Sequence, residues 1–352
     1  MAKNINPHQI ANRIANRNKF DDVNILFQLL IDGNPLALSK AITIIESQKN
    51  DDQIKALGII ERCIQHQKET TKKSMRIGIT GIPGVGKSTF IDSFGMLCVE
   101  KGHKLAILAV DPSSESAKGS ILGDKTRMEK LTQQKHVFIR PSPSSGNLGG
   151  VARKTRETMM VCEAAGFDFI VVETVGVGQS ETMVHQLVDM FILLMISGAG
   201  DELQGIKRGI MEMADLILIN KVDSENQKKI NQSKTDMLRA LHYMNLNEKG
   251  WNCQVETVSG LTGLNLNEAY EKMTHYFKVI IENGFYDINR KHQQLQWFEQ
   301  ELRDEVWNNF LHQSQISNQI KELKNKINNN QISVKMAVKK VVDQTIKNAT
   351  KK

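Results

Sequence analysis

The chain has 352 residues, of which 24% are charged and 40% are hydrophobic, the usual composition of a globular protein. A chain of this length can bury a substantial core, in one large unit or in two to three smaller ones. No apolar run approaches the ~20 residues that a membrane-spanning helix needs, and the N-terminus lacks the apolar core of a signal peptide. We therefore expect a cytoplasmic protein without a membrane partner.

The net charge of +7 is concentrated near the C-terminus. From Lys321 onward, nine lysines stand against Glu322 and Asp343, so this segment carries the whole positive excess. The remainder of the chain shows no basic excess that would favour a nucleic-acid partner. The cysteines are far apart and form no C-x-x-C pair or Cys/His cluster, which predicts reduced core thiols. They are Cys63, Cys98, Cys162 and Cys253.

Residues 1–73 show helical periodicity without strand signals. Their apolar positions recur at three- and four-residue steps from Ile25 to Ile45, with a turn at residues 32–35. A polar run at residues 65–73 is typical of a linker. We predict an N-terminal helical extension over this part of the chain.

Residues 74–285 alternate short apolar runs with helical stretches. Continuous apolar strands separated by helices predict an α/β domain with a mostly parallel sheet that is covered on both faces. Ligands of such sheets bind beyond the carboxyl ends of the strands. The predicted strands cover residues 76–80, 105–110, 137–140, 169–173, 190–196, 216–220 and 255–259.

Residues 286–352 return to a helical pattern. An apolar stripe at three- and four-residue steps predicts a long amphipathic helix or hairpin, followed by a last helix at residues 334–346. This arm either contacts a second copy of the chain or folds back on its own domain. The basic tail at its end is typical of a solvated segment.

The most specific motif follows the first predicted strand. The segment from Gly81 to Ser88 reads GIPGVGKS and matches the phosphate-loop signature G-x-x-x-x-G-K-[ST]. Its backbone N–H groups and the helix that follows are expected to surround phosphate oxygens. Lys87 is placed to reach the β- and γ-phosphates, and the Ser88 hydroxyl to ligate Mg²⁺. The predicted phosphate-binding residues are Gly81, Gly84, Val85, Gly86, Lys87, Ser88 and Thr89.

A second motif, N-K-x-D, ends the predicted strand at residues 216–220. The Asp223 carboxylate can accept hydrogen bonds from N1–H and the exocyclic amine of guanine, a donor pair that adenine lacks. Lys221 can lie along the base, and Asn220 can tie neighbouring loops together. In combination with the phosphate loop, this motif favours GTP over ATP. Backbone N–H groups of Ser259, Gly260 and Leu261 are expected near the base oxygen O6.

Three acids are predicted metal-linked residues. Glu173 ends a predicted strand in ETVG, at the place where GTPases usually carry D-x-x-G, and the Gly176 N–H can sense the γ-phosphate. Asp111 closes the second predicted strand, and Asp124 lies in a Ser- and Gly-rich region. With Ser88 these acids form the predicted Mg²⁺ site, and Lys87, Asp111 and Glu173 form the predicted catalytic set. A turn-capping role for Asp111 stays open.

Three Gly-rich segments, at residues 141–150, 176–180 and 198–209, resemble switch loops that rearrange when the γ-phosphate leaves. No Gln directly follows Gly176, where small GTPases place a water-orienting side chain. We therefore predict slow unaided hydrolysis, below about one turnover per second. Gln179 and Lys207 are possible helpers or structural residues.

Together these segments closely resemble the methylmalonyl-CoA mutase-associated GTPases. The most specific matches are ILGDKTRM at residues 121–128 and ETVGVGQSE at residues 173–181. The resemblance implies a P-loop NTPase fold of the SIMIBI type with helical extensions at both ends. It also implies a homodimeric G-protein chaperone that uses GTP and Mg²⁺ to gate cofactor loading of an adenosylcobalamin-dependent methylmalonyl-CoA mutase and to protect that enzyme. By the same resemblance, the C-terminal helices would supply the dimer contact.

Other functions stay open on the sequence alone. One is a kinase-type phosphotransferase linked to amino-acid (arginine or ornithine) transport, although no acceptor-activating base is evident. Another is a metal-insertion GTPase, although the cysteine spacing offers no Cys/His metal site. A third is a GTPase that serves an unrelated assembly.

Overall fold

The computed structural model describes residues 20–110, 128–141, 148–174, 180–197, 208–223, 226–242, 248–312 and 314–349. The chain divides into two compact units, Met1–Arg290 and Lys291–Lys352. The predicted three-domain division, with boundaries after residues 73 and 285, stays a prediction. Among the described helices, none is both long enough and apolar enough to cross a membrane.

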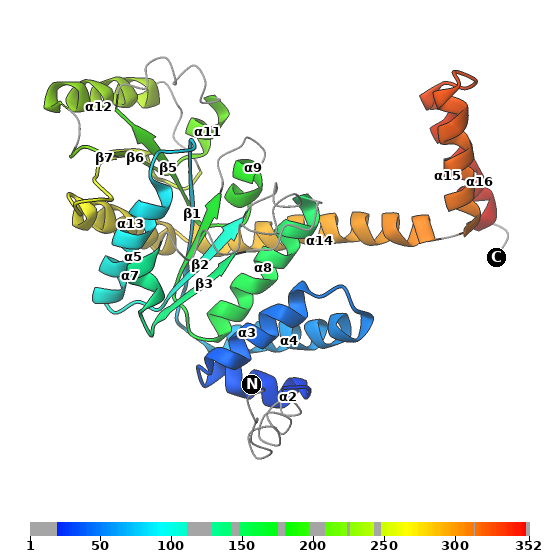
Figure 1. The fold of residues 1–352 in the computed structure, drawn as a ribbon, viewed down its shortest axis with the longest axis horizontal. Helices are drawn as coiled ribbons and strands as arrows, with labels where there is room; N and C mark the ends of the chain where they lie inside the picture. Colours follow the sequence, from blue (N-terminus) through cyan, green and yellow to red (C-terminus); the bar gives the residue numbers. More distant parts are fainter. Residues whose placement is uncertain are drawn as a thin grey trace, which may run out of the picture. The chain divides into compact units, whose positions relative to one another are not determined.

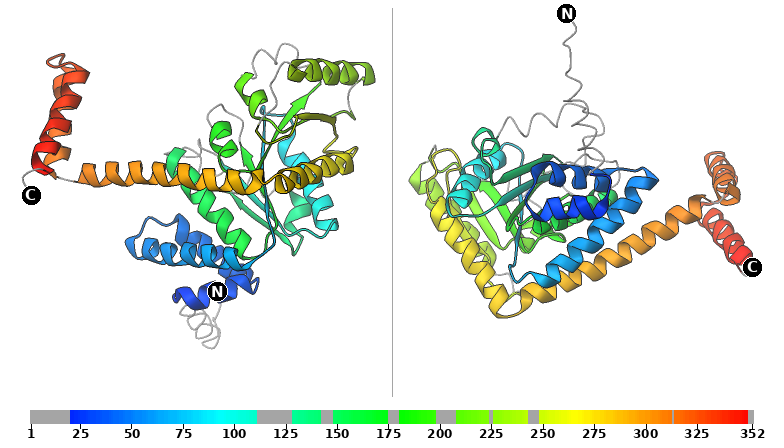
Figure 2. Two further views of the ribbon diagram at one scale, coloured as in Figure 1. Left: turned by 180° about the vertical axis from the view of Figure 1, so that it is seen from behind. Right: turned by 90° about the horizontal axis from the view of Figure 1, so that it is seen from below.

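The first unit begins with three helices, α2 (Val23–Ile31), α3 (Pro35–Glu46) and α4 (Asn50–Glu69). Asp22 caps α2 by accepting hydrogen bonds from the N–H groups of Asn24 and Ile25 at 2.7 and 3.3 Å. Asn34 caps α3 in the same way, with a proline at the first helical position. These helices pack on one another, and α3 and α4 also pack on α8 (Leu148–Ala164), as Figures 1 and 2 show. The three helices therefore form an additional layer outside the sheet.

The centre of this unit is a seven-stranded sheet in the order β3-β2-β4-β1-β5-β6-β7 (Figure 1). All six strand pairings are parallel. This result confirms the predicted α/β fold and extends it, because the sheet has no antiparallel pair among the described strands. The strands are β1 (Met75–Gly81), β2 (Leu105–Val110), β3 (Val137–Pro141), β4 (Phe169–Thr174), β5 (Met190–Ile196), β6 (Leu216–Asn220) and β7 (Gln254–Thr257).

Both faces of the sheet are buried, which explains why its strands read as continuous apolar runs. Ile217 and Ile219 of β6 pack with α11 (Arg208–Met213) and α12 (Gln227–His242). The alternate residues Leu216 and Leu218 belong to the large core on the other face. That core is completed by α5 (Lys87–Glu100), α7 (Glu129–Thr132) and α13 (Leu266–Glu282), whereas α9 (Ser180–His185) packs on β1 and β4.

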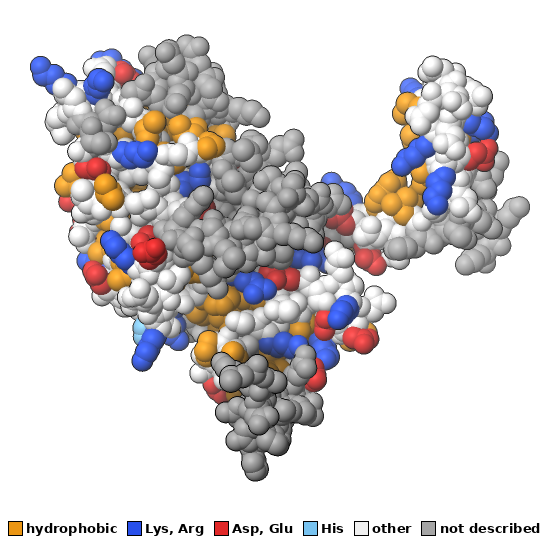
Figure 3. All heavy atoms as spheres, viewed as in Figure 1, with side chains coloured by type: hydrophobic (Ala, Val, Ile, Leu, Met, Phe, Trp, Pro, Cys, Tyr) orange, Lys and Arg blue, Asp and Glu red, His pale blue; other side chains and the backbone are white. Residues whose placement is uncertain are grey.

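The second unit contains the remainder of α14 (Phe285–His312), together with α15 (Ser314–Asn328) and α16 (Val334–Ala349). The last two helices form a hairpin around a small core of Ile316, Leu323, Ala337 and Val341. Apolar and basic side chains share the surface of the hairpin that is visible in Figure 3. Val334 and Val338 of α16 are 62% and 57% exposed.

Several predicted element boundaries differ from the observed ones, and two of these differences have a clear local cause. The helix α4 continues to Glu69, so most of the predicted linker at residues 65–73 is helical. The last turns of α4 are mostly exposed, so their side chains are polar and show no apolar periodicity from which a helix could be predicted. The strand β7 ends at Thr257 instead of residue 259, because Ser259 closes a turn in which its carbonyl accepts from the Gly263 N–H at 2.9 Å.

Candidate functional site

The phosphate loop joins β1 to α5 at the carboxyl edge of the sheet. Lys87 is buried, and its ammonium donates to the carbonyls of Gly81 at 2.7 Å and Ile82 at 3.3 Å. Gly86, immediately before α5, has a φ of +92°, a left-handed conformation that favours glycine. A Cβ at Gly86 would also lie 2.9 Å from Nδ2 of Asn220. The loop is therefore held close to the residues that end β6.

Asn220 links the two halves of the site. Its Nδ2 donates to the Val85 carbonyl at 2.9 Å, and its Oδ1 accepts from the Gly260 N–H at 2.9 Å. The side chain is buried at 2% exposure, so these two bonds are shielded from water. Asn220 thus ties the phosphate loop to the loop after β7, as the sequence suggested.

Asp223 lies at the exposed end of the same motif, where Ser259 Oγ donates to its Oδ1. Lys221, which lies between Asn220 and Asp223 in the motif, has a φ of +65°, an uncommon conformation for a residue with a Cβ. Ser259 Oγ also accepts from the Thr262 N–H at 3.0 Å. The Asp223 carboxylate is therefore oriented by the buried Ser259 while it remains accessible to a base.

The loop after β7 rests directly on α5. A Cβ at Gly260 would lie 2.8 Å from the Phe90 Cα, which leaves no space for a side chain. The Gly260 carbonyl accepts from Ser93 Oγ at 2.6 Å. The Gly260 N–H donates a hydrogen bond to Asn220 Oδ1, whereas the sequence predicted that it would donate to the base oxygen O6. Leu261, which is 73% exposed, has the accessible position.

The acidic part of the site contains two buried carboxylates on different elements. Glu173, near the end of β4, is 8% exposed and accepts from Ser88 Oγ at 3.3 Å. Glu181, in the first turn of α9, is 3% exposed. Burial lowers the pKa of Lys87, and the two carboxylates act in the opposite direction. Glu181 is not among the predicted site residues, although it ends the distinctive ETVGVGQSE segment.

Below the phosphate loop, Thr174 Oγ1 donates to Thr80 Oγ1 at 2.9 Å and so joins the ends of β4 and β1. Both threonines are buried. No sequence pattern predicts this contact, because only the strand order brings the two positions together.

Five predicted site residues lie outside the described residues: Asp111, Asp124, Gly176, Gln179 and Lys207. Their predicted roles stay predictions. Within the described ranges, no group of three or more His, Cys, Asp or Glu side chains could hold a metal ion.

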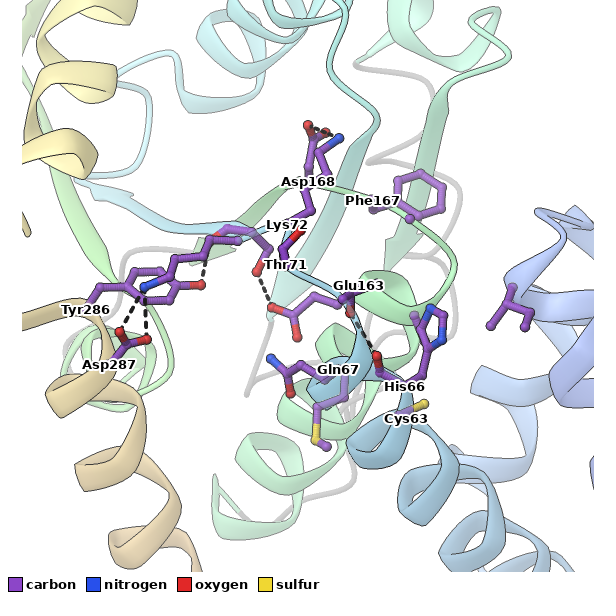
Figure 4. A pocket seen from close by; sticks show the side chains of 17 residues that line it. Cys63, His66, Gln67, Thr71, Lys72, Glu163, Phe167, Asp168, Tyr286 and Asp287 are labelled. Carbon is purple, nitrogen blue, oxygen red and sulfur yellow. Dashed lines mark hydrogen bonds and ion pairs between the residues drawn. The ribbon is translucent and has the colours of Figure 1, made fainter. Parts of the chain in front are cut away.

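A cavity of about 550 Å³ lies at the opposite, amino edge of the sheet (Figure 4). Its lining includes the segment before β1, the end of α8 and the start of α14, and it contains Cys63, Glu163 and Asp168. We call it the amino-edge cavity. Because parallel strands place the phosphate loop at their other ends, this cavity is separate from the candidate nucleotide site.

A family model described as "Methylmalonyl Co-A mutase-associated GTPase MeaB" matches residues 38–315. The chain belongs to this family. The match covers the N-terminal layer from α3 onward, the whole sheet and α14. Membership in the MeaB family confirms the resemblance found in the sequence, and it makes the chain a P-loop GTPase.

Curated relatives agree with this assignment. A putative GTPase of Caulobacter vibrioides is 49% identical over 81% of this chain and 86% of its own length. GTPase ArgK of Escherichia coli is 39% identical over 88% of this chain and 92% of its own length. A Mus musculus protein named methylmalonic aciduria type A homolog, mitochondrial, is 39% identical over 87% of this chain and 75% of its own length.

A solved structure described as an LAO/AO transport system kinase has the same fold. It superposes with a TM-score of 0.71 at 31% sequence identity and covers 92% of this chain and 97% of its own. The likeness extends over nearly all of both chains.

Proposed function

We propose that this GTPase acts as a G-protein chaperone for an adenosylcobalamin-dependent methylmalonyl-CoA mutase, gating cofactor loading and protecting the mutase. The observation that carries the proposal is the match of residues 38–315 to a family described as mutase-associated. The name of the mouse relative, methylmalonic aciduria type A homolog, supports it. The cytoplasmic location remains a prediction from the sequence.

The geometry suits a nucleotide bound along the carboxyl edge of the sheet. In this proposal the backbone from Gly81 to Thr89 surrounds the phosphates, and Lys87 moves from its loop carbonyls to the β- and γ-phosphate oxygens. Asp223 accepts hydrogen bonds from the guanine base, Lys221 lies along it, and the Leu261 N–H approaches its O6. Asn220 keeps the two halves of this surface at a fixed separation.

The residues present fit Mg²⁺, because hydroxyl and carboxylate oxygens are the ligands that this ion prefers. Ser88 Oγ and Glu173 Oε1 are 3.3 Å apart, so both can turn toward one ion. Asp111 and Asp124 are the proposed further acids. When bound, Mg²⁺ neutralises charge on the β- and γ-phosphates. Ser88 and Glu173 hold their oxygens at this point, and Lys87 adds a fixed positive charge.

We further propose that the working form is a homodimer whose contact involves the C-terminal helices. Several large apolar side chains on α14 are exposed within the second unit, among them Leu295 and Phe298, each 64% exposed. Exposed apolar patches of this kind mark interaction sites.

The proposal is tested by GTP turnover of the purified protein with and without the mutase from the same cell. We expect slow turnover alone, a clear rise with the mutase and a nucleotide-dependent complex. Lys87→Ala should abolish the stimulated turnover. Unchanged turnover, together with no complex under GDP or a non-hydrolysable GTP analogue, would reject the mutase as partner and leave the GTPase intact.

The same experiment separates a kinase from a hydrolase. The LAO/AO transport system kinase description of a structural relative makes this alternative worth testing. Terminally labelled GTP should release its label as inorganic phosphate. Label that appears on a protein or small-molecule acceptor would favour a phosphotransferase.

A further inference from the structure

Glu181 is a buried carboxylate that neither the phosphate loop nor the guanine motif explains. It lies in the first turn of α9 and is 3% exposed. Ionised side chains are rarely buried to this degree unless a charge or polar group balances them. The position of α9 identifies the charge that Glu181 faces.

The helix α9 packs closely on β1. A Cβ at Gly78 would lie 2.8 Å from Val184 Cγ1 and 3.1 Å from Val188 Cγ2, so this part of the chain lies directly against the strand. Glu181 precedes Val184 by three residues and therefore shares its helix face. Because α9 follows the parallel strand β4 and leads back to β5, its first turn lies toward the carboxyl edge of the sheet.

The strand β1 ends at Gly81, the first residue of the phosphate loop. Thr80 is two residues beyond Gly78 and therefore faces the same side of the sheet. Three residues of helix rise about 4.5 Å, so Glu181 is displaced from Val184 toward Thr80, the last residue but one of β1. The next residue is Gly81, whose carbonyl accepts from Lys87 Nζ at 2.7 Å. The charge of Glu181 acts on the buried Lys87 and opposes the effect of burial on its pKa.

We propose that Glu181 is a positioning residue for Lys87: its buried carboxylate lies on the α9 side of the phosphate loop and, with Glu173, holds the lysine ammonium in the orientation that receives the β- and γ-phosphates. Glu181 itself touches neither phosphate nor metal in this arrangement. Loss of its charge leaves the ammonium buried with one balancing carboxylate fewer. This inference rests on the proposed role of Lys87 at the phosphates and is independent of the mutase partner.

The test is nucleotide binding and turnover by the full chain carrying Glu181→Gln, an uncharged side chain of nearly the same shape. Affinities are measured for GTP, GDP and GMP. Since Lys87 is proposed to contact the β- and γ-phosphates, we expect GDP and GTP affinity to fall about tenfold, the effect of one weakened charge-assisted contact. GMP affinity should change less than twofold, and kcat should fall together with the affinity for GTP.

Glu129→Gln is the matched control, because Glu129 also lies in the first turn of a short helix but is exposed. It should leave all three affinities unchanged. Glu181→Asp, which keeps the charge on a shorter side chain, should recover a large part of the GDP affinity and provides a second variant if Glu181→Gln folds poorly. A merely structural role would lower GMP and GDP affinity alike.

Lys87→Ala distinguishes failure of the proposed Lys87 role from failure of the proposed Glu181 role. If Lys87→Ala weakens GDP binding strongly but Glu181→Gln leaves the ratio of GDP to GMP affinity within twofold of wild type, Glu181 does not position the lysine. If Lys87→Ala also leaves this ratio unchanged, the proposed role of Lys87 fails first. Equal losses for GMP, GDP and GTP in Glu181→Gln and Glu181→Asp would likewise overturn the inference.

Discussion

Two side chains at the guanine end of the site have different tasks, although they are three positions apart. Asn220 is buried and has its donor and acceptor engaged with Val85 and Gly260. Asp223 is exposed and is oriented by Ser259. In the proposed function, base recognition depends on Asp223, whereas Asn220 maintains the loop geometry. Replacement of each should have a different consequence.

Asp223→Asn should change the preferred base. An Asn amide N–H clashes with the guanine N1–H and amine donors but can donate to the 2-oxygen of xanthine. We expect GTP affinity to fall by a factor on the order of 10² and XTP affinity to rise above that of wild type. Competition binding with both nucleotides measures the change. Retained GTP preference in this variant would show that Asp223 does not read the base.

Gly260→Ala tests the close approach of the base loop to α5. The added Cβ would lie 2.8 and 2.9 Å from the Phe90 Cα and N, which are backbone atoms that cannot rotate away. We expect loss of about 1–3 kcal/mol of stability together with weaker GDP binding. Denaturant unfolding and nucleotide titration measure the two effects. Gly209→Ala is the control, since no atom of the described residues lies within 4 Å of the position that a Cβ at Gly209 would take. Equal loss of stability in the two variants would show that the contact of Gly260 with Phe90 is not the cause.

At the scale of elements, four charged side chains connect the amino edge of the sheet to the first turns of α14. Arg76 of β1 contacts Glu163 of α8 at 2.8 and 2.6 Å. Arg290 of α14 makes two bonds to Asp189, at 2.6 and 2.7 Å, and one to Glu163 at 3.2 Å. The charges are largely buried, so each acid depends on its arginines for solvation. This cluster fixes where α14 starts.

The cluster predicts acid-sensitive stability. Burial alone would raise the pKa of Glu163, but Arg76 and Arg290 outweigh burial and hold it at about 2, against an ordinary value of 4.5. Because the folded-state pKa is the lower one, the stabilisation is fully present above pH 4.5 and is lost as the pH falls toward 2. Glu163→Gln should cost about 3–5 kcal/mol at pH 7, because it removes the acid that Arg76 contacts and leaves Arg290 with Asp189 alone.

Denaturant unfolding between pH 7 and pH 2.5 checks this prediction. The difference in unfolding free energy between wild type and Glu163→Gln should shrink as the pH falls. The control is Glu282→Gln, whose acid pairs with Lys278 only at 3.9 Å and is 65% exposed, so its effect should stay within about 0.5 kcal/mol. A pH-independent difference for Glu163→Gln would count against the ion cluster as its cause.

At the scale of the whole molecule, the two units differ in how their apolar residues are covered. The first unit buries both faces of its sheet, whereas the second leaves a row of large apolar side chains exposed on α14. Their spacing of three and four residues places Leu295, Phe298 and Leu302 on one helix face. The proposed homodimer would cover such a face.

We expect the combined substitution of Leu295, Phe298 and Leu302 by serine to convert the proposed dimer into a monomer. Light scattering after gel filtration measures the mass, and GTP turnover measures the nucleotide domain, which should remain active. Leu57→Ser is the control, because Leu57 on α4 is also highly exposed, at 69%, and has no proposed role at the nucleotide. A wild-type monomer, or a triple variant that stays dimeric, would contradict the proposed contact.

The sequence by itself determined the parts of this protein that depend on local chemistry. The phosphate loop, the N-K-x-D motif and the alternation of apolar strands with helices are short patterns, so they predicted a parallel α/β GTPase and its family. The tertiary structure decided what depends on distant segments meeting. Strand order joined Thr80 to Thr174, gave the Gly260 N–H to Asn220 instead of to a base, and brought Glu181 of α9 near enough for its charge to act on Lys87. Burial, likewise, gathered Arg76, Glu163, Asp189 and Arg290 into one cluster, since no local pattern encodes which charges will share an interior.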